Sequence, residues 1–324
     1  MSHPETTNTE PACPACDARE FKERFQLTDR LYHTTREQFS ILECKVCGLL
    51  RLYPWPDAAV LDRYYPPGYW FSPQPDTAHR LEEAYRRLVL RDHVRFVRTA
   101  LRHSSAHGLV LDVGCGGGLF LHLLHEEGFP VAGLDFSFEA ASVAWKRNGV
   151  PAVCANLGHA PVSAETCSGV TMFHVLEHVY DPAAYLECAH RMLKPDGRLI
   201  VQVPNAECWQ FRVFSSRWNG LDVPRHLINF RRRDILRLIE LAGFEIVREK
   251  HFSLRDNPAG FATSVSTALD PMARRVRGVK EGGAVRLVKD LVYFCLVVAG
   301  LPFAALEALF NAGSSIMIEA RKKQ

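Results

Sequence analysis

The sequence predicts an α/β fold in which a seven-stranded, mostly parallel sheet carries helices on both faces, with a small zinc-ribbon-like module at the N-terminus. Three observations predict it. Short apolar runs alternate with helical segments from Leu109 onward, a glycine-rich turn follows the first run, and two Cys-x-x-Cys pairs lie near the N-terminus. Alternating strands and helices indicate a parallel sheet, because each crossover helix returns the chain to the same end of the sheet.

The composition is ordinary for a globular protein, with 47% hydrophobic and 23% charged residues among 324. The net charge of +3 is too small to indicate a nucleic-acid partner. The first residues, MSHPETTNTE, have neither the basic region nor the apolar run of a signal peptide. We therefore expect a cytoplasmic protein, in which paired cysteines hold metal more often than they form disulfides.

Composition divides the chain into four segments. Residues 1–10 are polar and are predicted to form a disordered tail, and residues 11–56 contain both cysteine pairs. Residues 57–104 are predicted to be an aromatic, proline-rich linker followed by a lead-in helix. Residues 105–324 form the predicted core, with an apolar helical insertion at about 260–312.

The elements of the core follow from the spacing of its apolar residues. Strands are predicted at residues 109–113, 130–134, 168–173, 198–203, 244–247 and 315–320. Helices are predicted at residues 78–103, 119–127, 138–147, 181–193 and 233–242. The last of these helices stops at Gly243, as a glycine just past a helix end predicts.

The glycine-rich turn after the first strand is the most informative segment. Gly114, Gly116 and Gly118 stand at alternate positions, where glycine lets the backbone approach a ligand that a side chain would displace. Asp135 ends the next strand, and a carboxylate there suits the two hydroxyl donors of a ribose. Such a turn can also serve NAD or FAD, or form a plain tight bend. Asp112 favours a ligand with an amino group, because a dinucleotide needs a bare helix N-terminus for its pyrophosphate.

These motifs resemble those of class I S-adenosylmethionine (SAM) dependent methyltransferases, whose core is Rossmann-like. The turn and Asp135 match the first two motifs of that family. Residues 173–182 resemble the family's segment after the fourth strand, and residues 193–201 resemble the turn into the fifth. The resemblance covers residues 105–250. It implies that SAM is bound by Asp112, Gly114, Cys115, Gly116, Gly118, Asp135, Phe136, Asn156, Leu157, Phe173 and His174.

By the same resemblance, each part of SAM has its own partners. The backbone of residues 114–118 would cradle the methionine part, Asp135 would hold the ribose hydroxyls, and Phe136 would pack near the adenine. The family often has an acidic residue that bonds the adenine amino group after the third strand. Asn156 stands there in this chain, and its carbonyl oxygen can accept the same hydrogen bond.

Two histidines are candidates for a catalytic base. An oxygen or carbon nucleophile must lose a proton during methyl transfer, and histidine titrates near neutral pH. His178 follows the fourth strand and His226 follows the fifth, so both lie at the sheet edge where open α/β folds bind substrates. The alternatives are a capping or packing role for His178 and a structural loop role for His226.

Metal binding at this segment is a further question. His174-x-x-Glu177-His178 spells the inverted zincin pattern, but that pattern needs a helix and here it begins where a strand ends. The segment also resembles the Glu-x-x-Glu-His segment of ubiquinone-pathway O-methyltransferases, which bind a divalent metal there. His174 replaces the first glutamate, so a metal near Glu177 and His178 stays an open question.

The two cysteine pairs predict a structural zinc site. Cys13, Cys16, Cys44 and Cys47 supply four thiolates, and Gly48 follows the second pair as such a turn often requires. Four protein ligands leave no open position for catalysis. The alternative is four free, buried cysteines. A Cys₄ module before a class I core resembles sugar, natural-product and polysaccharide-cluster methyltransferases, although the long C-terminal domain of the sugar C-methyltransferases is missing.

An apolar stretch near the C-terminus, residues 287–310, departs from the α/β pattern. Gly300 and Pro302 interrupt it, and a spanning helix needs about 20 apolar residues without a break. We expect two short helices that are buried in the fold or form a substrate lid, a dimer face or a membrane-surface contact.

The sequence therefore predicts a methyltransferase that modifies an O, N or C atom of a small molecule, such as a sugar or natural-product intermediate. A zinc-containing RNA methyltransferase is one alternative, but residues 11–56 hold seven basic and six acidic residues, a balance that disfavours phosphate binding. A non-catalytic SAM-binding or zinc-ribbon adaptor is the other. No nucleic-acid partner is expected.

Overall fold

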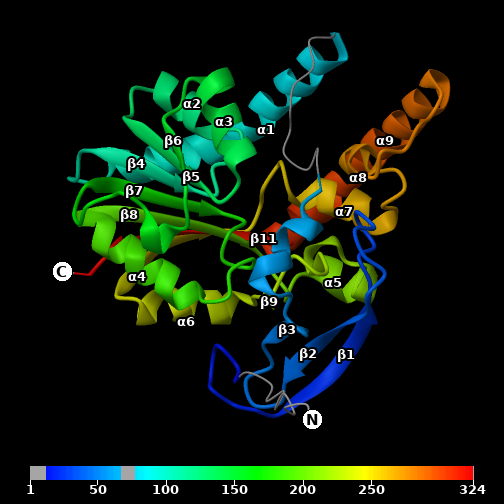
Figure 1. Cartoon of the computed structure of the whole chain (residues 1–324), viewed down its shortest axis with the longest axis horizontal. Coiled ribbons are helices and arrows are strands. Elements are labelled where there is room, and N and C mark those ends of the chain that lie inside the picture. The colour runs from blue at the N-terminus through cyan, green and yellow to red at the C-terminus, as the bar shows by residue number, and fades with distance from the viewer. Residues whose placement is uncertain (1–11, 67–76, 324) are drawn as a thin grey trace, which may run out of the picture.

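The structure is a computed structural model that describes residues 12–66 and 77–323 (Figure 1). It confirms the predicted α/β class. A seven-stranded sheet has the order β10-β11-β8-β7-β4-β5-β6, and a second, four-stranded sheet has the order β1-β2-β3-β9. The predicted tail at residues 1–10 and the proline-rich residues 67–71 lie outside the described residues.

The large sheet is parallel except at one strand. Neighbours from β8 to β6 pair in parallel, whereas β11 runs antiparallel to both β8 and β10. The strands are β4 (Leu109–Val113), β5 (Val131–Asp135), β6 (Ala152–Cys154), β7 (Cys167–Phe173), β8 (Leu193–Pro204), β10 (Phe244–Lys250) and β11 (Ser315–Lys322). The short strand β6 was not among the predicted runs, because its three residues are too few to show a period.

Helices cover both faces of this sheet, with α1, α2 and α3 on one and α4 and α6 on the other (Figure 1). Their bounds are α1 (Thr77–Arg102), α2 (Leu119–Glu126), α3 (Phe138–Asn148), α4 (Pro182–Met192) and α6 (Arg232–Leu241). Side-chain oxygens cap the N-termini of α3 and α4. Ser137 accepts from the N–H of Ala140, and Asp181 accepts from the N–H of Ala184. Apolar side chains such as Val110 and Met172 are fully buried between the layers.

The N-terminal module forms the smaller sheet together with a strand of the core. Its strands are β1 (Phe21–Leu27), β2 (Phe39–Cys44) and β3 (Leu50–Tyr53), and β9 (Ile228–Asn229) completes it. Leu52 donates its N–H to the carbonyl of Leu227, and the side chains of Ile41, Leu52 and Ile228 are all fully buried. The module and the core therefore share one apolar interior.

Short elements connect these layers beside the strand ends. They are the 3₁₀ turns η1 (Ala58–Tyr64), η2 (Leu157–His159), η3 (Ser215–Arg217) and η4 (Asn219–Leu221), and the helix α5 (Trp209–Phe214). Strands and helices of the large sheet stop alternating after β8. The segment that follows contains α5, η3, η4 and β9. Its last loop leads through Arg225 and His226 into β9.

The insertion between β10 and β11 corrects one expectation. It consists of α7 (Asn257–Val265), α8 (Pro271–Val276) and α9 (Gly283–Leu309), so the apolar stretch lies in one 27-residue helix and not in two short ones. Pro302 lacks an N–H donor, but the helix continues through it. Gly300 is required by packing, because a Cβ there would lie 2.9 Å from the Phe261 ring of α7. The expectation of burial is also wrong, since only 17% of the most apolar window is buried.

A buried arginine joins the module to the core. Arg225 is fully buried and donates to both carboxylate oxygens of Asp29, at 2.9 and 3.0 Å, and to Asp222 at 2.7 Å. Burial opposes the ionisation of Asp29, but Arg225 and Thr34 outweigh burial and hold its pKa well below the usual range. The fold therefore depends on an ionised Asp29.

We expect Asp29→Asn to lower the free energy of unfolding by about 3–5 kcal/mol at pH 7, because it leaves Arg225 buried with only part of its charge compensated. The depressed pKa means that the contribution of Asp29 is present above the ordinary carboxyl pKa, near 4, and is lost as pH falls below it. Urea unfolding from pH 7 to pH 3 measures both effects. Asp57→Asn is the control, because Asp57 is exposed and asparagine keeps its acceptor for the Ala59 N–H. An equal loss at pH 7 and pH 3 would contradict the linkage.

Candidate functional site

The glycine-rich turn joins β4 to α2 and forms an open cradle. Gly114, Gly116 and Gly118 all have positive φ angles, between 52° and 76°. A Cβ on Gly114 would lie 2.8 Å from Val175, and one on Gly118 would lie 2.8 Å from Ala144. A Cβ on Gly116 would meet nothing within 4 Å. Two glycines therefore permit close packing, and the backbone of the third faces free space in which a ligand fits.

Asp135 fixes this turn to the start of α3. Its carboxylate accepts the N–H of Gly116 at 2.8 Å and the N–H of Ser137 at 2.9 Å. Each oxygen keeps a lone pair for a hydroxyl donor. Asp112, near the end of β4, is also buried and accepts the hydroxyl of Thr171 at 2.5 Å. Burial raises the pKa of Asp112 to about 7, so the approach of a cation would favour its charged form.

The remaining predicted SAM residues surround the turn at different depths. Phe136 is 44% exposed, and its ring lies 5.4 Å from that of Tyr65. Asn156 is exposed and its side chain makes no capping hydrogen bond, whereas Leu157 is buried in the core. Cys115 is buried under Gly133. Phe173 packs edge-on against Phe120 and His93.

His178 and His226 lie against each other, with ring centroids 4.6 Å apart. The Nδ1 atom of His178 lies 3.0 Å from the carbonyl oxygen of Arg225, and Nδ1 of His226 lies 2.8 Å from that of Gly220. A carbonyl oxygen only accepts, so each Nδ1 carries a proton and Nε2 is the second titrating atom of each ring. Burial, with a smaller contribution from His226, lowers the pKa of His178 to about 4. His178 is therefore neutral at pH 7.

His174 has the opposite charge state. It has a left-handed backbone, with φ of 56°, and its ring lies between Glu177, at 3.1 Å, and Asp256, at 3.6 Å. Burial disfavours the charged ring, but the two carboxylates outweigh burial and raise its pKa to about 9. Asp256 also accepts from Gln202 and Ser253. His174 is thus held as a cation and has no lone pair to offer as a base.

A group of three side chains also has the composition of a cation site. The ligand atoms of Glu177, His178 and His226 lie within 4.8 Å of one another. One oxygen of Glu177 accepts from His174, and the other is buried without a hydrogen-bond partner among the described residues. A carboxylate oxygen and two imidazole nitrogens are suitable ligands for a divalent transition metal.

A cavity of about 1250 Å³ opens beside the histidine pair. Its lining includes His178, His226, His174 and Asp256, and continues to residues of α8 and α9. More than half of the lining residues are polar or charged, and Tyr32, Tyr85, Trp218 and Tyr293 add aromatic surface. The space is large enough for a small-molecule ligand.

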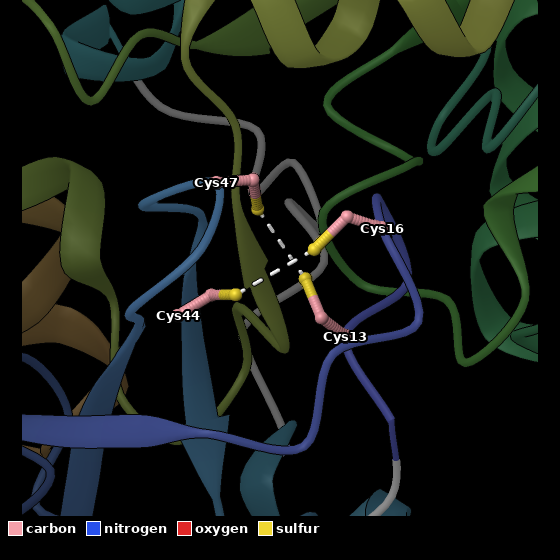
Figure 2. A group of neighbouring side chains, drawn as sticks. All are labelled: Cys13, Cys16, Cys44 and Cys47. Carbon is pink, nitrogen blue, oxygen red and sulfur yellow. Dashed lines mark hydrogen bonds between the residues drawn. The ribbon is translucent and has the colours of Figure 1, made fainter.

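Figure 2 shows the four cysteines of the N-terminal module pointing toward one centre. The sulfur atoms of Cys13 and Cys47 are 3.5 Å apart, and those of Cys16 and Cys44 are 3.6 Å apart. Tetrahedral zinc with Zn–S bonds of about 2.3 Å separates its sulfur ligands by about 3.8 Å. The geometry and the donor set therefore fit a zinc ion with four thiolate ligands.

Comparison with known proteins identifies the family. Residues 78–249, which are more than half of the chain, match the family described as "Methyltransferase domain". The chain belongs to this methyltransferase family. The matched residues contain the glycine cradle and both catalytic candidates.

Two relatives illustrate how far the similarity of this methyltransferase extends. The ubiquinone biosynthesis O-methyltransferase of Pectobacterium carotovorum is 31% identical over 161 residues, which are 46% of this chain and 66% of that enzyme. A probable SAM-dependent methyltransferase of Mycolicibacterium smegmatis is 30% identical over 184 residues, which are 55% of this chain and 60% of that protein. The chain thus spans less than two thirds of the length of these relatives.

Among solved structures, geranyl diphosphate C-methyltransferase from Streptomyces coelicolor has 16% identity and a TM-score of 0.45, and the similarity covers 82% of this chain and 83% of that one. A SAM-dependent methyltransferase from Archaeoglobus fulgidus has 18% identity and a TM-score of 0.48, covering 76% and 100%.

Sequence reasoning did not single out three residues that shape the site. Asp256 is 82 residues from His174 in the chain and begins α7, and the sequence gives no sign that the two meet. Tyr65 lies in the linker, yet its hydroxyl is 3.2 Å from Nδ1 of His178. Arg225 stands next to His226, but only the structure shows that its side chain is buried.

We expect Gly116→Val to weaken binding of S-adenosylhomocysteine at least tenfold, because the side chain would fill the space above the turn. Calorimetry measures the affinity. Gly128→Val is the matched control, since Gly128 also has a positive φ and open surroundings but lies between α2 and β5. Both substitutions strain the backbone by about 1–2 kcal/mol. Equal affinities in the two variants would show that the turn does not hold the cofactor.

Proposed function

We propose that the enzyme methylates a hydroxyl group of a polar small molecule. In this proposal His178 or His226 removes the proton of that hydroxyl. The observation that supports it best is the pair of histidine rings, each held by a carbonyl oxygen at Nδ1, beside one cavity with many polar lining residues. A sugar or a natural-product intermediate with free hydroxyls fits such a lining. The relative named as a ubiquinone biosynthesis O-methyltransferase gives further support to a small-molecule acceptor.

In this proposal the glycine cradle and Asp135 hold SAM, whose methyl group is electrophilic when bound. The open backbone at Gly116 would receive the methionine part, and the free lone pairs of Asp135 would accept from the ribose hydroxyls. Phe136 and Asn156 would bind the adenine. The protein's contribution is mainly to bring two reactants into line and to exclude water.

The histidine pair supplies the base. A neutral imidazole whose Nδ1–H is fixed by a carbonyl presents Nε2 in one orientation, so a hydroxyl proton has a defined acceptor. Charged His174 stabilises the nearby Glu177 carboxylate and cannot accept the proton itself. The charge on His174 thus leaves His178 and His226 as the candidate bases, with Nε2 of His226 at 3.9 Å from Asp222.

The alternative with RNA as the acceptor has less support. The charges of the module are nearly balanced, and several of its basic residues pair with acidic neighbours, as Lys22 and Arg24 do with Glu43. Nucleic-acid sites need basic surface that is free to bind phosphate. The module instead contacts the core through Asp29 and β9.

We expect His178→Gln or His226→Gln to lower kcat by about 100-fold or more while S-adenosylhomocysteine affinity stays unchanged. The base must be neutral, and the pKa of His178 is lowered to about 4, so the wild-type rate should fall only as pH approaches that value and stay flat from pH 6 to pH 8. Release of S-adenosylhomocysteine with a panel of sugars and phenols measures turnover. His103→Gln, an exposed histidine, is the control.

The same assay distinguishes a metal role for these residues. If a chelator abolishes turnover while elemental analysis still finds the zinc of the four cysteines, and a divalent cation restores turnover, then Glu177, His178 and His226 act as ligands and the base assignment is wrong. If turnover survives the chelator but is lost in the histidine variants, the result supports a histidine as the catalytic base. Near-normal turnover in both histidine variants would also reject it, because such an acceptor would need no proton removal.

We further propose that Cys13, Cys16, Cys44 and Cys47 hold one structural zinc ion. The sulfur separations and the grouping of four thiol ligands support it. Reduced thiolates are required, which agrees with the predicted cytoplasmic location. The ion would fix the ends of the module whose loop carries Asp29.

Elemental analysis of protein purified without chelator should find about one zinc per chain. Cys44→Ser should release it and lower the thermal midpoint by several degrees, because metal binding supplies folding free energy. Cys154→Ser, at an exposed cysteine outside the cluster, should change neither value. Metal-free wild-type protein with an unchanged midpoint would refute the site.

A further inference from the structure

Helix α9 exposes a long apolar face to solvent. Leu287 is 69% exposed and Leu291 is 59% exposed, and Val285, Val288 and Val292 beside them are also exposed. The exposed apolar side chains form a broad stripe along the helix, which continues through Phe294, Val298, Leu306, Leu309 and Phe310. At about 1.5 Å per residue, residues 287–310 extend for about 36 Å.

The charged residues within this stretch are paired with groups of the fold. Asp290 pairs with Arg274, and Lys289 pairs with Glu281. Glu307 is fully buried and accepts from Gln210 at 2.8 Å. These are the only charged residues between positions 287 and 310. A surface helix of a globular protein has the reverse arrangement, with its charges outward and its apolar stripe inward.

Basic residues flank the N-terminal end of the stripe. Residues 271–290 contain six basic residues and two acidic ones. Both acidic residues, Glu281 and Asp290, are engaged by Arg274 and Lys289. Lys280 and Arg275 are exposed beside the stripe, and so is Arg286, whose guanidinium lies 3.8 Å from Asp290. The surface thus combines an uncharged apolar stripe with a positive border.

We propose that α9 and its basic border dock the enzyme onto an anionic phospholipid surface. Apolar side chains would enter the boundary between headgroups and acyl chains, and the basic residues would contact the headgroups. The helix lies on the surface and does not cross, because its inner face packs on α7 and the chain enters β11 at Ser315 soon after α9 ends. Figure 1 shows α9 projecting along the edge of the molecule, beyond the sheet.

A second copy of this chain is a weaker match for the surface. On a second α9 the acidic side chain near this border, Asp290, is already paired with Arg274 and Arg286 of its own chain. Anionic headgroups provide that charge along the whole border. Charge complementarity therefore favours lipid over self-association.

Docking would also orient the cavity. The lining that contains His178 and His226 continues to Arg275, Lys280 and Arg286. The membrane would then lie beside the entrance used by the acceptor, so amphipathic acceptors could reach the histidines from the lipid surface. This consequence rests on the proposed function, whereas the docking itself does not.

Vesicle co-sedimentation of the full chain tests the docking directly. The probes are phosphatidylcholine vesicles with and without about one third phosphatidylglycerol, at low and high salt. We expect binding to the anionic vesicles that weakens with salt. Leu287→Ser/Leu291→Ser should reduce it at least tenfold, and Lys280→Gln/Arg286→Gln should remove most of the preference for anionic lipid.

Matched controls separate docking from folding. Leu241→Ser/Val247→Ser changes two side chains that are 73% and 47% exposed outside α9, and it should bind vesicles like the wild type. Unchanged S-adenosylhomocysteine affinity in every variant shows that the fold is intact. Equal binding to neutral and anionic vesicles would overturn the proposal. So would a protein that binds no vesicles and instead forms a lipid-free dimer, if Leu287→Ser/Leu291→Ser dissociates that dimer. Failure of turnover assays would leave this result unaffected.

Discussion

The arrangement of the site depends on one buried guanidinium group. The side chain of Arg225 binds Asp29 of the module and Asp222 of its own loop, while its backbone carbonyl accepts from Nδ1 of His178. His226 is the next residue. One residue therefore sets the position of the module, the tautomer of one histidine and the placement of the other. Because a buried ion pair is strongly destabilised when one partner is lost, the module and the histidine pair form one energetic unit.

The second constraint is a division of charge between histidines that are close in sequence. His174 and His178 are four residues apart, yet the pKa is raised to about 9 in one and lowered to about 4 in the other. Burial acts in the same direction on both rings. The difference comes from Asp256 and Glu177, which contact His174, and from the neighbouring imidazole of His226 at His178. Environments that separate the pKa values of similar groups in this way are typical of sites where each group has one task.

Local signals in the sequence predicted much of this structure, and contacts between distant segments determine the rest. The turn after β4 was predictable because three glycines at alternate positions after a buried strand are typical of a ligand-binding turn, and most long strands and helices of the core lie within a few residues of their predicted bounds. The cluster around His174 was not predictable, since Asp256 reaches it through tertiary packing. The prediction for α9 was wrong because Gly300 and Pro302 are helix breakers in isolation. Packing of Gly300 against Phe261 overrides that preference.

The core of the chain identifies the family, whereas the segments added to the core line the cavity for the acceptor. The predicted SAM residues lie between Asp112 and His174, inside the matched residues 78–249. The cavity is also lined by Leu31 and Tyr32 of the module and by many residues after Arg255, which are outside the match. These additions touch each other, because Arg277 donates to the carbonyl of Leu31 and Tyr32 contacts Met272. The module and the insertion therefore close over the same cavity. Acceptor choice in this methyltransferase should follow changes in those two segments, while substitutions within the cradle should affect all acceptors alike.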